Sequence, residues 1–559
     1  MEGNDMKHAR ILGMGSALAC VAAMGWAIPF DNSSGGPVTA TVGPNPTDDY
    51  PSLAAAAAAF SAVTPSIERE WTLLITGDLT ETTASYFGNT FGPNGKLIIK
   101  PAPATQPVVR FQIPTAPAGI YGDLVIGVTN GNLVNATNDR TSNGNYVIDG
   151  SNTPGGTTRD LTFMVPVGTN DPMLRVIRVW GDNHGVVIKN IKVYTYDSSG
   201  SSHCIGIAGG NVGGVSKSPN DLVIENCYLH AEPLGSTTGF GVDSSSTANG
   251  GMLPGDTMSV TIRGCTIEGK QRGIFLTHDD ALIENNDILV TSGTGTTMTY
   301  AGIFPFNVLN GNIGTITIRN NRIRMPGTPS TSAGQGAIGI FIDTGTSVAN
   351  VQIYNNIIKD MTFTSASPVD LLYRPISCAP NSAASTNFLV EHNSINADAS
   401  PAVSGATGGR AAGISFPTAV TASGSAVIRN NIVVFREADG TAAGIYLASP
   451  TNVVSVGNNI VSPRAIGRIG VNDYLLLTDW QLAGYDTAAT GGQSVDPALT
   501  TPAWDADLHF AYKPIGGLGN VAASTILTDF DGNARPASGA VPGADEPVLN
   551  AGVADWALF

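Results

Sequence analysis

A short pattern, apolar-x-Asn followed by an optional second Asn, one further residue and a second apolar residue, recurs nine times in this 559-residue chain. Gly or His replaces the first Asn in two copies. The third positions of successive copies are 36, 38, 21, 35, 35, 37, 38 and 28 residues apart, so the shortest interval gives the length of one unit without inserted loops. The copies are Ile188–Val193, Ile224–Leu229, Ile262–Ile267, Ile283–Ile288, Ile318–Ile323, Ile353–Ile358, Val390–Ile395, Ile428–Val433 and Val456–Val461.

A second pattern, Gly-apolar-x-apolar, falls between successive copies of the first. Each unit therefore carries at least two strands with alternating side chains. A single unit cannot bury its apolar positions, whereas stacked units bury them in one continuous column. The sequence predicts an all-β solenoid, a parallel β-helix whose coils pair ~4.8 Å apart. The second pattern occurs at Gly273–Leu276, Gly302–Pro305, Gly339–Ile342, Gly413–Phe416 and Gly444–Leu447.

The repeated Asn residues have two physical uses at a sharp corner between sheets. Asn tolerates the left-handed backbone that such a corner requires, and its amide can bond the Asn of the coils above and below. Cys227 and Cys265 fall in the same column, where we expect them to pack as small apolar residues, a disulfide being the alternative. The outward residue of each copy alternates in charge, which predicts ion pairs between coils rather than catalysis. These outward residues are Lys189, Glu225, Arg263, Glu284, Arg319, Tyr354, Glu391 and Arg429.

The first 27 residues have the composition of a secretory signal peptide. Lys7, His8 and Arg10 precede the apolar run Ile11–Ala27, and small residues follow at its end. A membrane anchor, the alternative, needs about 20 uninterrupted apolar residues. We expect a secreted or cell-surface protein with no transmembrane span after removal of the signal.

The remaining chain is predicted to divide into three parts. Residues 28–95 form an N-terminal cap that contains an Ala-rich helix after Ser52, a plausible N-cap residue. Residues 96–470 form the β-helix, and residues 471–559 form a C-terminal cap or tail. Exposed strand edges at the ends of such a solenoid leave self-association open.

Charge excludes one class of partner. The net charge is −16 and the isoelectric point is about 4.7, which argues against nucleic acid because phosphate binding needs a basic surface. It also disfavours a basic groove for a polyanionic sugar, although a local basic patch is compatible with this total. The cysteines show no zinc-ligand spacing.

Three stretches resemble extracellular right-handed parallel β-helix repeat proteins, the pectate-lyase-like superfamily in the broad sense. Val147–Asn152 with Thr158–Thr162 is similar to the opening coils of bacterial surface β-helix proteins. Val495–Pro497, and Asp531-Gly with Arg535-Pro and Gly543–Glu546, are similar to a closing motif of such domains. The resemblance implies a right-handed β-helix. It implies no particular reaction, since enzymes and non-enzymes share this scaffold.

Catalytic motifs of the superfamily are largely missing. Of the motifs of polygalacturonase-like hydrolases the chain has only Asp279-Asp280. Arg324-Met-Pro326 begins like the Arg-x-Pro-x-x-Arg motif of pectate-lyase-like enzymes, but the second Arg is absent. The sequence therefore favours a non-catalytic scaffold.

Candidate chemistry lies on the coil between Gly264 and Asn285, which is too short to carry loops. Because the neighbouring coils carry longer loops, the short turns of this coil are expected to leave a notch between those loops. His278, Asp279 and Asp280 follow the strand on this coil, and Asp243 occupies a comparable strand end one coil earlier.

Three uses of this notch are open. His278, Asp279, Asp280 and Asp243 are the catalytic candidates, as a carboxylate pair for glycosidic cleavage. Asp243, Asp279 and Asp280 could instead bind Ca²⁺. A lyase would use Lys270 or Arg272 as its base. The simplest interpretation is that all are ordinary turn residues.

The sequence therefore predicts an exported β-helix scaffold that is glycan-binding, adhesive or structural. The alternative is a polysaccharide-active enzyme, a lyase or a glycoside hydrolase, with its site around residues 270–280. The expected partner is a polysaccharide or cell-surface glycan. Tyr300, Phe304 and Phe306 are candidates for aromatic contact with a sugar, with at least one of them pointing inward.

Overall fold

The structure is a computed structural model. It describes residues 28–114, 122–127, 142–143, 145–169, 174–181, 183–196, 202–212, 215–217, 219–232, 238–244, 259–277, 280–291, 300–306, 314–326, 328–330, 336–343, 349–365, 372–380, 385–399, 411–421, 423–437, 442–457, 459–462, 465–486, 524–536 and 542–544. The predicted signal peptide, His278 and Asp279 lie outside these ranges. Within them, no helix is both long enough and apolar enough to cross a membrane.

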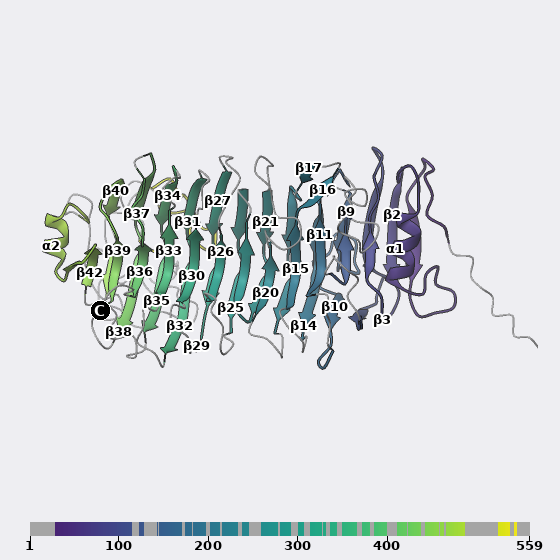
Figure 1. The fold of residues 1–559 in the computed structure, drawn as a ribbon, viewed down its shortest axis with the longest axis horizontal. Coiled ribbons are helices and arrows are strands. Elements are labelled where there is room, and N and C mark those ends of the chain that lie inside the picture. Colours follow the sequence, from purple (N-terminus) through teal and green to yellow (C-terminus); the bar gives the residue numbers. More distant parts are fainter. Residues whose placement is uncertain are drawn as a thin grey trace, which may run out of the picture.

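Three long sheets run side by side along the molecule (Figure 1). Sheet 1 has thirteen parallel strands, each from a different coil. Its strands are β1 (Val38–Val42), β2 (Glu70–Ile75), β5 (Lys96–Pro101), β9 (Tyr146–Asp149), β13 (Val187–Lys189), β18 (Leu222–Glu225), β21 (Ser259–Arg263), β24 (Asp280–Glu284), β27 (Gly314–Arg319), β31 (Ala349–Tyr354), β34 (Asn387–Glu391), β37 (Ser425–Arg429) and β40 (Val453–Gly457).

Sheet 2 follows sheet 1 around each coil and is also parallel. Its strands are β3 (Leu79–Glu81), β6 (Val108–Phe111), β10 (Leu161–Val165), β14 (Ile191–Thr195), β19 (Tyr228–Ala231), β22 (Thr266–Gly269), β25 (Asp287–Val290), β28 (Arg322–Arg324), β32 (Ile357–Ser365), β35 (Ser394–Ala399), β38 (Ile432–Glu437) and β41 (Ile460–Ser462), with β29 (Thr328–Ser330) beside β32.

Sheet 3 completes each coil, and only its last strand pairs antiparallel. Its strands are β4 (Ser85–Phe87), β7 (Leu124–Ile126), β11 (Arg175–Trp180), β15 (Ser202–Ala208), β20 (Gly239–Asp243), β23 (Arg272–Leu276), β26 (Tyr300–Pro305), β30 (Gly336–Asp343), β33 (Leu372–Ala379), β36 (Ala412–Phe416), β39 (Ala443–Leu447), β42 (Ala465–Ile469) and β43 (Asn472–Tyr474). Two small sheets pair β8 (Ser142–Asn143) with β12 (Asn183–His184) and β16 (Gly210–Val212) with β17 (Val215–Lys217).

The inward side chains of the three sheets form one continuous apolar core. Each coil contributes alternate residues to it, so stacking buries what one coil alone would expose. This arrangement is the predicted parallel β-helix, and parallel connections of this kind are right-handed in nearly all proteins. Strands β1 and β2 already belong to the stacked sheet, although they precede residue 96, where the β-helix was predicted to begin.

The corner between sheets 1 and 2 carries the repeated Asn residues. The two predicted roles, the left-handed backbone and the amide ladder, fall on two successive positions of the repeat. The third residue of each copy has a left-handed backbone, with φ of 50–63° where the structure describes it. The fourth residue points inward and forms an amide ladder. At each step the backbone N–H and Nδ2 of one residue donate to Oδ1 of the next at 2.8–3.2 Å. The ladder runs through Asn286, Asn321, Asn356, Asn393, Asn431 and Asn459 to Asp486.

Cys265 and Cys227 continue this ladder toward the N-terminus. Both are buried and neither forms a disulfide, as expected. The charged residues on the outside of the corner pair between coils as predicted, including Arg263 with Glu225 at 3.1 Å and Arg429 with Glu391 at 3.0 Å.

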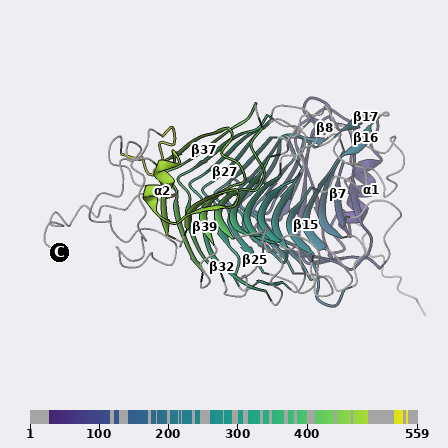
Figure 2. The ribbon, with the colours of Figure 1, turned by 60° about the vertical axis from the view of Figure 1, so that its left-hand side comes forward.

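Helices close both ends of the column (Figure 2). In α1 (Leu53–Ser61) the N-cap Ser52 accepts a hydrogen bond from the Ala55 N–H, as its position predicted. In α2 (Leu477–Leu482) the Trp480 ring lies so close to Gly467 that a Cβ there would overlap it. Trp480 Nε1 also donates to Asp486, which ends the amide ladder.

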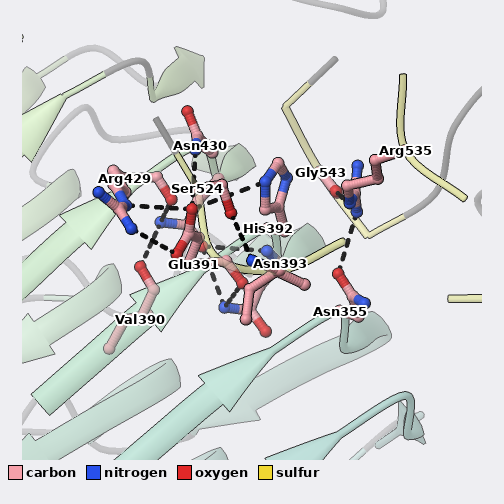
Figure 3. Close-up of polar contacts among 12 residues, drawn as sticks. Asn355, Val390, Glu391, His392, Asn393, Arg429, Asn430, Ser524, Arg535 and Gly543 are labelled. Carbon is pink, nitrogen blue, oxygen red and sulfur yellow. Dashed lines mark hydrogen bonds and ion pairs between the residues drawn. The ribbon is translucent and has the colours of Figure 1, made fainter. Parts of the chain in front are cut away.

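The segment 524–536 with 542–544 packs against the Asn corner (Figure 3). Asn355 Nδ2 donates to the carbonyl of Thr528 at 2.7 Å, and Arg535 donates to Asn355 Oδ1 at 3.0 Å. The Gly543 N–H donates to the carbonyl of Asn430 at 2.8 Å. Part of the closing motif thus binds coils that lie far away in the sequence.

Candidate functional site

The outer face of sheet 3 carries two rows of side chains, which the strand register defines. Buried members such as Phe240 and Phe304 lie outside the continuous core, whereas Val242 and Ile303 belong to it. The first row contains Arg175, His203, Phe240, Arg272, Ala301, Ile338, Arg374, Ala412, Ala443 and Ala465. The second contains Arg178, Gly206, Asp243, Phe275, Phe304, Phe341, Ser377, Ser415, Tyr446 and Arg468.

Four residues of these rows, Arg175, His203, Asp243 and Arg272, form what we call the Asp243 cluster. Asp243 is buried at the end of β20, and its Oδ2 accepts a hydrogen bond from Arg175 at 2.6 Å. His203 Nε2 lies 3.9 Å from the same oxygen. Asp243 Oδ1 and His203 Nδ1 are buried without a hydrogen-bond partner. Such unsatisfied atoms are rare in folded proteins, and each of them calls for an explanation.

Burial and neighbouring charges shift the pKa values of the residues in this cluster, and the two effects often oppose each other. Burial raises the pKa of Asp243, but the positive charge of Arg175 and the contact with His203 outweigh it, so the pKa is lowered overall. Burial lowers the pKa of His203 to about 4, so its imidazole is neutral at pH 7. Burial also lowers the pKa of Arg272 to about 10, against the attraction of Asp243.

A ladder of phenylalanine rings extends from Arg272 along the outer face. The Arg272 guanidinium lies 5.0, 4.4 and 4.8 Å from the ring centres of Phe240, Phe275 and Phe304. The rings of Phe304 and Phe341 stack at 4.4 Å. Contacts of this kind offset part of the cost of burying a guanidinium.

A second polar group, the Arg374 cluster, follows the rings and consists of Arg374, Ser377, Ser415 and Tyr446. Arg374 is 4% exposed, and burial lowers its pKa to about 10. Its Nε and the hydroxyls of Ser377 and Ser415 are buried without a hydrogen-bond partner. The register places Ser377, Ser415 and Tyr446 on three successive strands. A carboxylate or sulfate is the chemistry that would satisfy one guanidinium and two hydroxyls together.

The residues predicted around the notch are only partly described. Asp243 lies in sheet 3, whereas Asp280 begins β24 in sheet 1 and is exposed. Partial burial and the negative charge of Asp221 raise the pKa of Asp280 against a hydrogen bond from Thr315, and no contact joins Asp280 to Asp243. Since His278 and Asp279 lie outside the described residues, the carboxylate pair stays a prediction.

The two candidate bases, Lys270 and Arg272, also lie in different sheets. Lys270 lies at the edge of sheet 2, half-buried, and Arg272 lies on the outer face of sheet 3. Among the described residues no group of three or more His, Cys, Asp or Glu side chains is arranged to hold a metal ion; Asp279 is not among them. Of the aromatic candidates, Tyr300 belongs to the core, while Phe304 and Phe306 contact each other on the outer side.

Sequence reasoning missed the Arg374 cluster, although a signal was present. The x of the Gly-apolar-x-apolar pattern is the second outer row, which holds Phe275, Phe304, Phe341, Ser415 and Tyr446. The pattern breaks at Arg374-Pro-Ile-Ser377, where Pro stands in place of Gly.

Comparison with known proteins gives one matching family model and several similar solved structures. Residues 255–472 match a family model described as the right-handed β-helix region. The structure is similar to that of pectate lyase Pel9A, at 12% identity and a TM-score of 0.36, over 92% of this chain and 97% of that chain. It is also similar to GH136 lacto-N-biosidase from Eubacterium ramulus, at 10% identity and a TM-score of 0.37, over 78% of this chain and 68% of that chain. No curated protein sequence matches the chain.

Proposed function

We propose that this right-handed parallel β-helix protein is an exported glycan-binding scaffold that holds an acidic polysaccharide along the outer face of sheet 3. The observation that carries the proposal is Arg374, a buried arginine that shares the outer face of sheet 3 with two buried hydroxyls, those of Ser377 and Ser415, that have no hydrogen-bond partner. The leader-like composition of the first 27 residues supports export.

Energetics favour a ligand at the Arg374 cluster. No described residue forms an ion pair or hydrogen bond with Arg374. Burying a charge without compensation costs several kcal/mol, and each unsatisfied buried hydroxyl adds about 1–3 kcal/mol. The carboxylate of a uronic acid would accept from the guanidinium and from Ser377 and Ser415, and this would recover part of that cost.

The rest of the outer face suits the sugar rings of the same chain. Three strand spacings separate Arg272 from Arg374, or about 14 Å at ~4.8 Å per coil. Phe304 and Phe341 lie on the two strands between them, and Phe275 lies on the same strand as Arg272. Their rings offer apolar surface to the C–H faces of sugars, while the arginines supply a local positive charge in a chain of net charge −16.

A second candidate function, cleavage of the bound polysaccharide by a lyase, is favoured by the Asp243 cluster. Its Arg272 has a pKa lowered to about 10, which brings a guanidinium closer to the range of a general base. His203 is neutral at pH 7 because of its lowered pKa and is a further proton acceptor.

Binding to polygalacturonate, measured by affinity gel electrophoresis and calorimetry, tests the primary proposal. We expect Arg374→Met to weaken binding at least about tenfold, since a charge-assisted contact contributes about 1.5–3 kcal/mol. Arg110→Met is the matched control, because it removes the same charge from an exposed ion pair on sheet 2. Equal losses in both variants, or none in Arg374→Met, would contradict the proposal.

The same samples test cleavage. The ultraviolet absorbance of unsaturated products is followed with and without Ca²⁺ in the wild type and in Arg272→Met. Product that disappears in Arg272→Met would establish the lyase, whereas binding without product would leave the scaffold.

A further inference from the structure

Aromatic side chains also gather on the outer face of sheet 2, away from sheet 3. Tyr194 on β14 and Tyr228 and His230 on β19 occupy half-buried positions that alternate with core residues. Tyr196 directly follows β14 and is also half-buried. We call these four residues the tyrosine cluster.

The four rings of the tyrosine cluster form one continuous surface. Tyr194 and Tyr196 stack with ring centres 6.1 Å apart and planes 17° apart. The ring planes of Tyr228 and His230 are 10° apart, and their ring centres are 6.3 Å apart. Contacts of 5.3–5.8 Å join the two pairs. The two pairs are tilted by 49–52° to each other and together form an aromatic platform that spans two adjacent coils.

Carboxylates border this platform. His230 Nδ1 lies 2.6 Å from Glu268 Oε2, and His230 Nε2 lies 3.2 Å from Glu232 Oε2. The side chain of Glu232 is 51% exposed. Oxygen atoms that accept hydrogen bonds therefore lie beside flat apolar rings.

The same two rows of sheet 2 look different a few coils further on. There β25 and β28 carry Asp287, Leu289, Arg322 and Arg324, with an ion pair between Arg324 and Asp287 at 3.1 Å. On these coils, charged residues that form ion pairs occupy the outer face of sheet 2. Cross-strand stabilisation needs no aromatic residue at these rows.

We propose that the tyrosine cluster is a second glycan-binding site, specific for neutral sugars. The four rings are partly exposed and can contact the apolar side of a sugar, and stacking on an aromatic ring contributes about 1–3 kcal/mol in comparable sites for bases. Glu232 and Glu268 accept hydrogen bonds from sugar hydroxyls, and their charge repels uronic acids. The site is separate from the acidic-glycan site on sheet 3 and does not depend on it.

Affinity gel electrophoresis with mixed-linkage β-glucan and galactomannan as neutral probes, and polygalacturonate as the acidic probe, tests this proposal. We expect at least one neutral polysaccharide to retard the wild-type protein and to perturb its tyrosine ultraviolet spectrum. The double variant Tyr194→Ala, Tyr196→Ala should bind that probe at least about tenfold more weakly. Tyr194→Phe with Tyr196→Phe keeps the rings and should retain most of the binding.

The controls separate the two sites. Arg374→Met should leave the neutral probe bound as in the wild type, and the Tyr→Ala variant should leave polygalacturonate binding unchanged. Thermal unfolding checks that each variant is folded. The proposal is overturned if neither neutral probe retards the wild type, or if both tyrosine variants bind it as the wild type does.

Discussion

The Asn corner and the outer face of sheet 3 both bury polar side chains, but they treat them differently. At the corner each described ladder amide bonds the residue on the next coil, as Asn356 does with Asn393 at 3.0 Å. On the outer face, Ser377 and Ser415 are equally buried, yet their hydroxyls have no partner. The first region uses buried polarity to hold coils together. The second leaves it without a hydrogen-bond partner.

The free energies involved explain why the two regions should respond differently to mutation. When a buried, hydrogen-bonded group is removed, its partners stay buried but lose their hydrogen bonds, which lowers stability. A buried group without a partner has already lost its water and has gained nothing inside the protein. Its removal therefore costs little stability, while it costs binding.

The largest expected effect is at the ladder. Asn356 donates to the carbonyls of Ile318 and Tyr354 and accepts from Asn321. Asn356→Ala leaves these groups buried and unbonded, and we expect it to lower the free energy of unfolding by about 3–5 kcal/mol. Thermal and denaturant unfolding measure the loss. A change below about 1 kcal/mol would remove the distinction between the two regions.

An intermediate effect is expected from acid at the outer face. Burial lowers the pKa of His203 from 6.5 to about 4, so between these values the unfolded chain binds a proton that the folded protein does not. Stability should therefore be complete above about pH 6.5 and fall as the pH approaches 4, by about 3 kcal/mol from this residue.

Unfolding midpoints between pH 4 and pH 7 check this dependence. His203→Gln should flatten that part of the profile. An equally steep fall in the variant would show that His203 is not its source.

The smallest expected effect on stability is at Ser377. Because its hydroxyl is buried without a partner, Ser377→Ala should change the free energy of unfolding by less than about 0.5 kcal/mol or stabilise the protein slightly. Polygalacturonate binding should weaken several-fold at the same time. A loss of stability as large as that of Asn356→Ala would mean that Ser377 has a structural role.

The repeat made the corner predictable from sequence. Third-position residues such as Asn320 mark the left-handed corner, their fourth-position neighbours supply the ladder, and the alternating charges of Glu284 and Arg319 predict an ion pair that the structure contains. These features recur on many coils, so each copy supports the others.

The outer face could not be predicted in the same way because its residues differ from coil to coil. Asp243 and Asp280 both lie at strand ends, yet β20 belongs to sheet 3 and β24, which begins at Asp280, belongs to sheet 1. The two carboxylates consequently have different neighbours. The Arg374 cluster could not be predicted because its members lie on different coils, and only the register of β33 and β36 brings Ser415 beside Ser377.

The most direct test of the central claim is the crystal structure of the protein with an oligogalacturonate bound. We expect a sugar chain along the outer face of sheet 3, with one carboxylate bonded to Arg374 and within hydrogen-bond distance of Ser377 or Ser415. A sugar bound elsewhere with this cluster unchanged, or Arg374 paired with a carboxylate of the protein itself, would contradict it.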